Sequence, residues 1–285
     1  MPGTLYLVAT PIGNLGDLSV RAAEILAQVD LIAAEDTRVT VKLLNHLGLK
    51  KPMVSYYRHN TETGGQAVLD RLLAGEDCAL VTDAGTPAIS DPGEDLVKLC
   101  AQQGVTVLSI PGPCALVSAL AVSGLPTGRF TFEGFLAMNK KNRRTHLESL
   151  RIEERTMVFY EAPHKLIATL EDMIRAFGPD RRVSLCRELT KLHEEVLRTT
   201  LGEAAAHYQE NAPRGEFVLV VEGAPPNRTS KFTMETGLER ARQLQEEGAS
   251  LRDAVRAAAQ EQGLSRSVLY QLAVAQKGNS SGNLS

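Results

Sequence analysis

Apolar residues in the first half of the chain form short runs that alternate with segments of helical spacing. Runs of Leu, Val, Ile and Ala that are bounded by polar or turn residues are typical of buried strands. We expect strands at residues 5–8, 31–34, 53–57, 78–81 and 105–110. We expect amphipathic helices between them, at residues 18–29, 40–47, 66–73 and 95–102. Strands that alternate with helices in this way predict βαβ units and a parallel sheet.

The pattern changes at residues 124–128, where Gly and Pro interrupt it. Beyond this point it predicts strands at 130–135, 157–160, 183–186, 195–199 and 217–221, and helices at 145–150, 165–177 and 202–209. Two of these strands follow each other through a short connection, which favours a mixed sheet over a fully parallel one. The second half therefore predicts another α/β domain, so that the fold class is two α/β domains followed by a helical tail.

The tail begins after a Gly-Ala-Pro-Pro-Asn linker at residues 223–227. Helices at 251–261 and 265–276, joined by a turn at Gly263, have the spacing of a helix-turn-helix hairpin. Its predicted packing face consists of Ala254, Ala258, Leu264, Val268, Leu269 and Leu272. The last residues are rich in Gly, Ser and Asn and are expected to be disordered. We therefore divide the chain into domains at 1–124, 125–224 and 225–277, with a disordered end at 278–285.

Composition and charge narrow the class of protein. The chain has 285 residues, of which 43% are hydrophobic and 23% charged, and this excludes a mostly disordered protein. No apolar stretch is long enough to cross a membrane and the N-terminus lacks a signal-peptide pattern, so a cytoplasmic protein is expected. The four cysteines lack metal-binding spacing, and no metal site is expected. A net charge of −3 argues against wrapping nucleic acid by bulk charge but is compatible with a local basic patch.

Three segments at predicted strand ends, residues 9–17, 82–93 and 111–114, are rich in Gly, Pro and short polar residues. In an open α/β sheet, ligands bind beyond the carboxyl ends of the strands. Gly and Pro in such loops give a rigid backbone that a ligand can approach closely. None of the three segments has the spacing of a dinucleotide fingerprint or of a Walker phosphate loop. Each could be a simple tight turn, but three at one edge of one sheet favour a ligand site.

Several motifs together resemble one family of methyltransferases. They are Ala34-Glu35-Asp36-Thr37-Arg38, the Thr82–Gly93 loop, Pro111-Gly112-Pro113, Glu133-Gly134-Phe135-Leu136, Tyr160-Glu161-Ala162-Pro163-His164, Arg187-Glu188-Leu189-Thr190-Lys191 and the segment from Gly215 to Gly223. Through them the chain resembles the tetrapyrrole-methylase-like methyltransferases over about residues 4–275. The corrinoid branch typically has a Gly-x-Gly-Pro-Gly first loop, where this chain has Thr10-Pro11-Ile12-Gly13-Asn14. This difference favours the branch that methylates a cytidine 2′-hydroxyl in 16S ribosomal RNA.

The resemblance implies a homodimer in which S-adenosylmethionine lies in the cleft between the two α/β domains. Mapped by motif, the methionine and ribose parts of the cofactor would contact Pro11, Asp83, Thr86, Gly112, Cys114 and Ala115. The adenine would lie against Tyr160, Glu161, Glu216, Phe217 and Val218. A carboxylate at Asp83 suits the sulfonium and ammonium charges of the cofactor. Taken alone, such an aspartate is more commonly an Asx-turn residue.

Methyl transfer to a ribose oxygen requires a positioned hydroxyl and a group that takes or shares its proton. The candidates for this role are Glu35, Asp36 and Arg38 after the second predicted strand, His59 and Asn60 beyond the third, and Glu188 with Lys191 in the second domain. Glu35 and Asp36 could instead belong to the first turn of a helix, and the lysine could be a solvated charge. The arginine beside the two acids favours a role at the edge of the cleft.

Positive charge that could bind RNA is concentrated at residues 139–144. The candidates are Lys140, Lys141, Arg143 and Arg144, which we expect on a mobile loop where they would bind phosphates. A solvated entry to a helix explains the same charges equally well. The tail offers Arg252, Arg256 and Arg266 outside its packing face, which is compatible with RNA contact. DNA reading by this tail is not expected.

The favoured hypothesis is an S-adenosylmethionine-dependent cytidine 2′-O-methyltransferase that acts on 16S rRNA or on the 30S subunit. Two other classes stay open. A small-molecule methylase acting on a tetrapyrrole predicts a deep apolar cleft without basic flanks. A non-catalytic RNA-binding protein predicts no binding of the cofactor.

Overall fold

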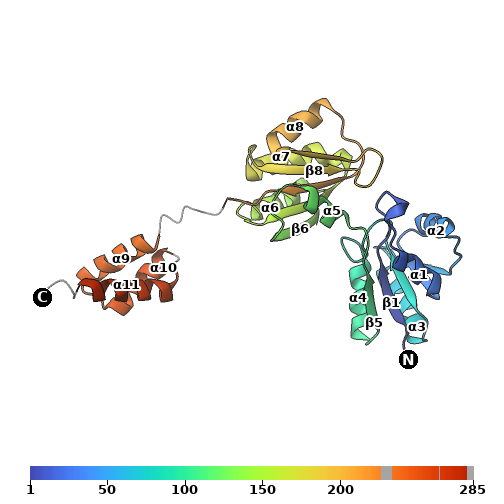
Figure 1. Cartoon of the computed structure of the whole chain (residues 1–285), viewed down its shortest axis with the longest axis horizontal. Coiled ribbons are helices and arrows are strands. Elements are labelled where there is room, and N and C mark those ends of the chain that lie inside the picture. The colour runs from blue at the N-terminus through green and yellow to red at the C-terminus, as the bar shows by residue number, and fades with distance from the viewer. Residues whose placement is uncertain (226–232, 263, 281–285) are drawn as a thin grey trace. The chain divides into compact units, whose positions relative to one another are not determined.

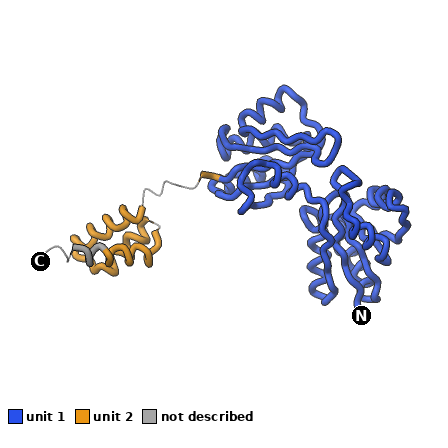
Figure 2. Tube along the Cα trace, viewed as in Figure 1, with its two compact units in different colours: residues 1–223 blue, residues 224–285 orange. Residues whose placement is uncertain are grey.

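The computed structural model describes residues 1–225, 233–262 and 264–280, and it divides the chain into two compact units. Unit 1 spans Met1–Gly223 and unit 2 spans Ala224–Ser285 (Figure 2). Both predicted α/β domains lie within unit 1, and the predicted helical tail corresponds to unit 2. Residues 226 and 227 of the predicted linker and the predicted turn at Gly263 lie outside the described residues. No helix in the described part of the chain is both long and apolar enough to span a membrane.

The first sheet of unit 1, in which Figure 1 labels β1 and β5, is fully parallel, as predicted, with strand order β3-β2-β4-β1-β5. Its strands are β1 (Thr4–Val8), β2 (Leu31–Ala34), β3 (Met53–Ser55), β4 (Cys78–Val81) and β5 (Thr106–Ile110). The helices that connect them are α1 (Val20–Gln28), α2 (Thr37–His46), α3 (Thr61–Leu73) and α4 (Gly93–Gln102). The connections therefore follow the βαβ pattern that the alternating apolar runs predicted.

Strand β2 shows why these strands are continuous apolar runs rather than alternating ones. Leu31 and Ala33 belong to one core cluster, packed with residues of α3 and α4. Ile32 and Ala34 belong to another, packed with residues of α1 and α2. Successive side chains of a strand point to opposite faces, and here helices cover both faces. All four residues are therefore fully buried.

The second sheet is mixed, as predicted, with strand order β6-β7-β10-β8-β9. Its strands are β6 (Phe130–Phe135), β7 (Thr156–Glu161), β8 (Arg182–Arg187), β9 (Glu195–Thr200) and β10 (Phe217–Val221). β6 and β7 pair in parallel, whereas β10 pairs antiparallel with β7 and β8, and β8 antiparallel with β9. The associated helices are α6 (Lys140–Ser149), α7 (Leu166–Phe177) and α8 (Leu201–Glu210).

Helix α5 (Ala115–Val122) joins the two sheets into one unit. It follows β5 of the first sheet, but its buried residues Leu116 and Leu120 pack against Val158 and Val220 of the second sheet. The Cys186 thiol of β8 also contacts the carbonyl of Ala119, at 3.8 Å. Helix α5 therefore follows the first sheet in the chain but belongs to the core of the second sheet.

Unit 2 consists of α9 (Met234–Glu246), α10 (Leu251–Gln262) and α11 (Arg266–Ser280). Its small core includes Leu238, Ala254, Ala258 and Leu269. The predicted two-helix hairpin missed α9, whose sequence is mostly charged and polar. The predicted packing face was wrong at two positions, because Val268 and Leu272 remain 43% and 39% exposed. Helix α11 also continues to residue 280, into the end that we expected to be disordered.

Candidate functional site

A cavity of about 600 Å³ lies in unit 1, lined by both of its α/β halves. The first half contributes the segments after β2, β4 and β5, and the second contributes the ends of β6, β7 and β8 and the start of β10. Of the predicted cofactor residues, the lining includes Asp83, Thr86, Cys114, Ala115, Tyr160, Glu161, Glu216, Phe217 and Val218. The structure therefore brings together most of the residues that the motifs indicated.

Hydrogen bonds tie the three Gly- and Pro-rich segments of the first half to one another. Thr10 and Gly85 form an isolated β-bridge, with N–H···O=C distances of 2.9 and 3.0 Å in the two directions. The Thr86 hydroxyl donates to the carbonyl of Pro113 at 3.0 Å. These contacts fix the three segments as one rigid edge of the sheet, as the sequence led us to expect.

The loop after β4 is held in a strained conformation by Asp91. Its carboxylate accepts backbone N–H groups from Ala88, Ile89 and Gly93, at 3.0, 3.2 and 2.7 Å. Ala88 and Ser90 have φ of 66° and 70°, a left-handed conformation that is unfavourable for residues with a Cβ. Such conformations persist where their surroundings over-determine them, and they are frequent at ligand sites.

Three carboxylates of the first half, Glu35, Asp83 and Asp91, line the cavity without a salt bridge among the described residues. Glu35 accepts a hydrogen bond from the Thr82 hydroxyl at 2.7 Å, and Asp83 accepts one from the backbone N–H of Asp36 at 3.1 Å. Partial desolvation, and then the negative charge of Glu35, raise the pKa of Asp83 above its ordinary value. This part of the cavity therefore has a surplus of negative charge that a cationic ligand would neutralise.

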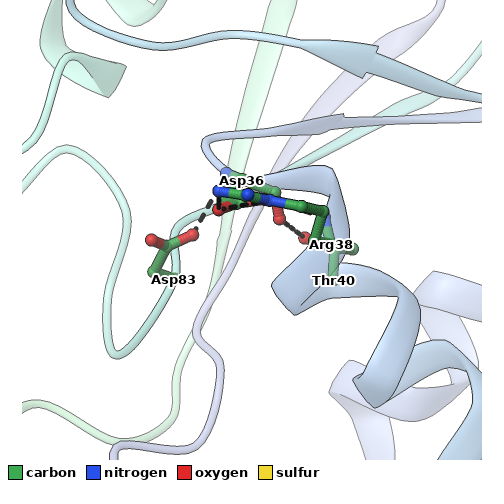
Figure 3. Close-up of polar contacts among 4 residues, drawn as sticks. All are labelled: Asp36, Arg38, Thr40 and Asp83. Carbon is green, nitrogen blue, oxygen red and sulfur yellow. Dashed lines mark hydrogen bonds and ion pairs between the residues drawn. The ribbon is translucent and has the colours of Figure 1, made fainter.

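Asp36 and Arg38 do not belong to the cavity lining. Asp36 is the N-cap of α2 and accepts the backbone N–H of Arg38 at 2.8 Å (Figure 3). The Arg38 guanidinium also pairs with this carboxylate, and its side chain is 88% exposed. The hydrogen bonds from Arg38 lower the pKa of Asp36 to about 2. The structure therefore places these two residues at the start of a helix, the alternative that the sequence left open, and beside the cavity lining rather than in it.

Two predicted cofactor residues, Pro11 and Gly112, are also absent from the lining. A Cβ at Gly112 would lie 2.9 Å from the Cβ of Ala9, so the glycine allows close packing of the chain on itself. The neighbours of these residues, Ile12 and Cys114, do line the cavity. The motif thus located the correct loops but not the residues that face the cavity.

In the second half, the buried ends of β7 and β10 form a closed apolar wall. Tyr160 pairs with Val218, and Glu161 pairs with Phe217. The Tyr160 hydroxyl accepts the backbone N–H of Leu116 at 3.1 Å, and burial raises the pKa of this tyrosine to about 12. The Glu161 carboxylate accepts the Thr169 hydroxyl at 2.6 Å and the N–H of Ala162 at 2.9 Å.

Lys191 lies in the loop after β8 and is held by two carboxylates. Its Nζ donates to Glu188 and to Glu216, each at 2.8 Å. Partial burial alone would lower its pKa, but the hydrogen bonds to the two glutamates outweigh this and raise it. Lys191 is therefore a stable ammonium group rather than a base.

The Lys191 loop touches the first half of unit 1 at Gly13. A Cβ at Gly13 would lie 2.4 Å from Cγ of Lys191 and 2.9 Å from Oγ1 of Thr190. Thr190 itself has a φ of 67°, and Glu188 a φ of 52°. A second strained loop thus faces the cavity, and only glycine allows the first loop to approach it this closely.

The predicted mobile basic loop at 139–144 was wrong, because these residues begin α6. Arg143 is 8% exposed and its guanidinium forms an ion pair with buried Asp172 at 2.7 Å. Arg144 bonds to the same carboxylate at 2.8 Å. Lys140 and Lys141 remain exposed on the first turn. Asn139 caps this helix, and that capping signal could have revealed its start.

The cavity lining also contains residues that sequence reasoning did not assign to it, among them Ile89, Ser90, Asp91, Phe135 and His164. Several belong to motifs that were recognised as segments. A motif alone does not say which side chain of a loop faces the ligand, because that depends on local backbone geometry.

The fold and the position of the cavity define a methylase of the tetrapyrrole type. Residues 4–205 match the model of the family Tetrapyrrole (Corrin/Porphyrin) Methylases. The chain therefore belongs to this family. It is similar to proteins called ribosomal RNA small subunit methyltransferase I. The Synechocystis protein of that name is 50% identical over 272 residues, which cover 95% of this chain and 98% of the relative.

The protein of the same name from Thermotoga maritima is 48% identical over 221 residues, 99% of its own length but 78% of this chain. The matched length is close to that of unit 1. Among solved structures, uroporphyrin-III C-methyl transferase from Thermus thermophilus, complexed with S-adenyl homocysteine, has the same fold. It superposes with a TM-score of 0.55 at 18% identity, covering 76% of this chain and 97% of that chain.

Proposed function

We propose that this protein uses S-adenosylmethionine to methylate the 2′-hydroxyl of a cytidine ribose in 16S rRNA of the small ribosomal subunit. The observation that carries the proposal is the cavity at the strand ends of both sheets, whose lining includes Glu35 and Asp83, two carboxylates that lack a salt bridge among the described residues. The similarity to methyltransferases named for small-subunit rRNA supports RNA as the substrate. Such a substrate would place the protein in the cytoplasm.

The residues present fit S-adenosylmethionine. Glu35 and Asp83 supply negative charge for its sulfonium and ammonium groups. Phe217 and Val218, at 2% and 5% exposure, form an apolar wall that suits an adenine ring. A volume of about 600 Å³ is within the range of sites for ligands of this size. We therefore assign the charged part of the cofactor to the first half and its adenine to the second half, beside Tyr160.

When bound, S-adenosylmethionine supplies a methyl group activated by the adjacent sulfonium. The task of the protein is to hold the ribose 2′-oxygen in line with that methyl group and to stabilise the charge that develops as the hydroxyl loses its proton. Lys191 uses two of its three ammonium donors for Glu188 and Glu216, which leaves one for a substrate oxygen. Its positive charge, secured by the raised pKa, would lower the pKa of the bound hydroxyl.

The proton of the hydroxyl needs an acceptor, and we assign this role to Glu35. One of its carboxylate oxygens accepts from Thr82, and the other has no hydrogen bond within the described part of the chain. Asp36 is a poor candidate because its carboxylate is taken up by Arg38 and by the N-terminus of α2. Of the predicted catalytic set, Glu35 and Lys191 therefore remain.

Lys140 and Lys141 are the proposed phosphate contacts of unit 1. They are exposed at the start of α6, soon after the cavity residue Phe135 of β6. Arg143 and Arg144 are occupied by Asp172, so we assign them a structural role in joining α6 to α7. This reduces the predicted basic patch to two lysines.

We also propose that the protein forms a homodimer. Helix α5 is almost entirely apolar, yet Val117 and Val122 are 55% and 39% exposed. A second copy covering this helix would remove that apolar surface from water. Sedimentation velocity tests the proposal, and a Val117→Asp variant should shift the protein towards monomer.

A tetrapyrrole substrate is the alternative within the family. A methylase for a tetrapyrrole needs a binding surface that is largely apolar. This cavity instead has the carboxylates Glu35, Asp83 and Glu188 and the Lys191 ammonium group in its lining. The cavity therefore favours a polar substrate such as ribose.

The decisive experiment is to incubate the protein with methyl-labelled S-adenosylmethionine and 30S subunits from cells that lack it. Label should appear in 16S rRNA and map to a cytidine, and alkaline hydrolysis should fail to cleave after it, because 2′-O-methylation removes the attacking hydroxyl. Label on a base would contradict the ribose assignment. Absence of label, together with absence of cofactor binding, would contradict the whole proposal.

A further inference from the structure

The rim of the cavity carries an aromatic side chain that the mechanism above does not use. Phe135 lines the cavity, yet it is 55% exposed. The other aromatic residues of the lining, Tyr160 and Phe217, are half-buried and fully buried. A large apolar side chain is thus held at the entrance of a polar site, where it costs free energy unless a ligand covers it.

A β-bulge places Phe135 at this position. β6 pairs with β7 so that Phe132 lies opposite Val158 and Phe135 lies opposite Tyr160, with a register shift between Phe132 and Gly134. Val158 and Tyr160 share one face of the sheet, because they are two residues apart. Without the extra residue, Gly134 rather than Phe135 would occupy that face. The bulge therefore aims a phenyl ring at the cavity, a common function of bulges beside binding sites.

The neighbours of Phe135 fix its ring but leave part of it uncovered. The ring of Tyr160 contacts it edge-on, with centroids 5.5 Å apart. Gly134, with φ of 62°, brings β6 to 3.6 Å from the Ser90 hydroxyl, measured from the ideal Cβ position. Ile89, beside Ser90, also lines the cavity and is 40% exposed. Two apolar side chains from two touching segments therefore border the rim.

Resting on the proposed function, we propose that Phe135 stacks on the base of the nucleotide whose ribose is methylated, with Ile89 beside it. A base presents a flat apolar face, and stacking on an aromatic side chain is the usual way proteins hold an unpaired base. The arrangement selects an unpaired nucleotide, because a base within a duplex is already stacked on both faces. The ribose attached to a base held at the rim would reach towards Lys191.

The kinetic test compares Phe135→Ala with Phe135→Tyr on 30S subunits that lack the methyl group. Loss of one stacking contact should lower kcat/KM of the alanine variant by about tenfold or more, chiefly through KM. The tyrosine variant keeps the ring and should act like the parent. Affinity for S-adenosylmethionine, measured by calorimetry, should be unchanged in both. If the alanine variant has parental kcat/KM, or loses cofactor affinity to the same extent, the proposal is overturned.

A fluorescence test does not depend on methylation. The chain contains no tryptophan, so Phe135→Trp introduces a single fluorophore at the rim. A pentacytidylate RNA should quench it by stacking, whereas the abasic RNA of the same length, which keeps the phosphates, should not. Ile152→Trp is the matched control, since Ile152 is 76% exposed and lies outside the cavity lining.

Different results would overturn the stacking role of Phe135 and the proposed methylation reaction. Equal quenching of the two tryptophans, or equal quenching by the two RNAs, would overturn the stacking role even if the enzyme methylates rRNA. Absence of methylation by the parent protein, with selective quenching at position 135, would instead overturn the proposed reaction and leave base binding intact.

Discussion

The two compact units differ in how much backbone strain and how much buried charge they contain. In unit 1, four residues other than glycine have a left-handed backbone, namely Ala88, Ser90, Glu188 and Thr190, and all lie in the two loops at the cavity. Unit 1 also buries the carboxylate of Asp172 against Arg143. In the described residues of unit 2, no non-glycine residue has this conformation, and ion pairs such as Arg240–Glu261 lie at the surface.

This difference agrees with the placement of the proposed chemistry in unit 1. Strained backbone and buried charge each cost free energy, and a domain retains them where a function requires them. Unit 2 avoids both and relies on a small Ala-rich core, which is sufficient for a helical module. The Thermotoga relative, whose whole length matches about as many residues as unit 1 contains, agrees with this division of roles.

The difference in buried charge between the two units is tested most strongly by removing one ion pair from each unit. Arg143→Ala should reduce the free energy of unfolding by about 2 kcal/mol, because Asp172 loses its buried partner and keeps only the more exposed Arg144. Arg240→Ala, the matched control in unit 2, should cost less than about 1 kcal/mol. Denaturant titration measures both values, and similar losses in the two variants would remove the distinction between the units.

The pH dependence of the free energy of unfolding tests the buried ion pair of Asp172 and Arg143 in a second way. Burial alone would raise the pKa of Asp172, but the hydrogen bonds from Arg144 and Arg143 outweigh it and lower that pKa. A carboxyl group with a lowered folded pKa stabilises the protein above its unfolded pKa of about 4, and this contribution is lost as the pH falls further. Denaturation at a series of pH values should therefore show a smaller acid-dependent loss for Asp172→Asn than for the parent.

Within unit 1, replacing Lys191 should change the methylation rate more than the affinity for S-adenosylmethionine. Lys191→Met removes the ammonium group that faces the proposed ribose oxygen, and the single-turnover methylation rate should fall by about 100-fold or more. Affinity for S-adenosylmethionine should stay near that of the parent. Lys140→Met removes an exposed cation of α6 and should reduce the rate far less. Comparable rates in both variants would show that Lys191 acts only as a surface charge.

Sequence patterns were sufficient to predict the architecture of unit 1. Every predicted strand is present, and the two sheets have the predicted parallel and mixed character. This follows from physics, since strands covered on both faces must be apolar throughout and helices must be amphipathic. The packing of α5 on the second sheet could not be predicted, because nothing in an almost wholly apolar helix indicates which sheet it will cover.

The loops of the site and most of the side chains predicted to contact the cofactor were predictable, but several other side chains were not. Glu35 and Asp36 are neighbours in one motif, yet only the first lines the cavity, because the second turns away to cap α2. Arg143 and Arg144 looked like free cations because Asp172 lies far away in the sequence. Phe135 depends on a bulge whose effect on side-chain direction appears only when β6 is paired with β7. In each case a long-range contact or the local backbone geometry decides where the side chain points and what it contacts.

A smaller effect is expected from Asp83→Asn, which keeps the shape of the side chain and removes its charge. Affinity for S-adenosylmethionine should fall by about tenfold, because a partly desolvated carboxylate beside a cation contributes on this scale. The matched control is Asp36→Asn, which alters a neighbouring carboxylate at the cap of α2, outside the cavity lining (Figure 3). Calorimetry should show near-parental affinity for the control, and equal losses would mean that both acids act through the fold of this loop.

The smallest effect should come from removing unit 2. A chain ending at Gly223 keeps every residue of the cavity lining and both sheets, so its affinity for S-adenosylmethionine and its melting transition should match those of unit 1 in the full chain.

Unit 2 carries three exposed arginines near one acid, Asp253. The hydrogen bond from Ser250 is the largest cause that lowers the pKa of Asp253, and the charges of Arg252, Arg256 and Arg266 lower it further. If they contact rRNA phosphates, the truncated protein should bind 30S subunits a few-fold more weakly at physiological salt, and the dependence of binding on salt should become less steep. Replacing the three arginines with Gln in the full chain is the matched control and should reproduce both changes. A truncated protein that binds subunits with the parental affinity and salt dependence would show that unit 2 contacts something other than RNA.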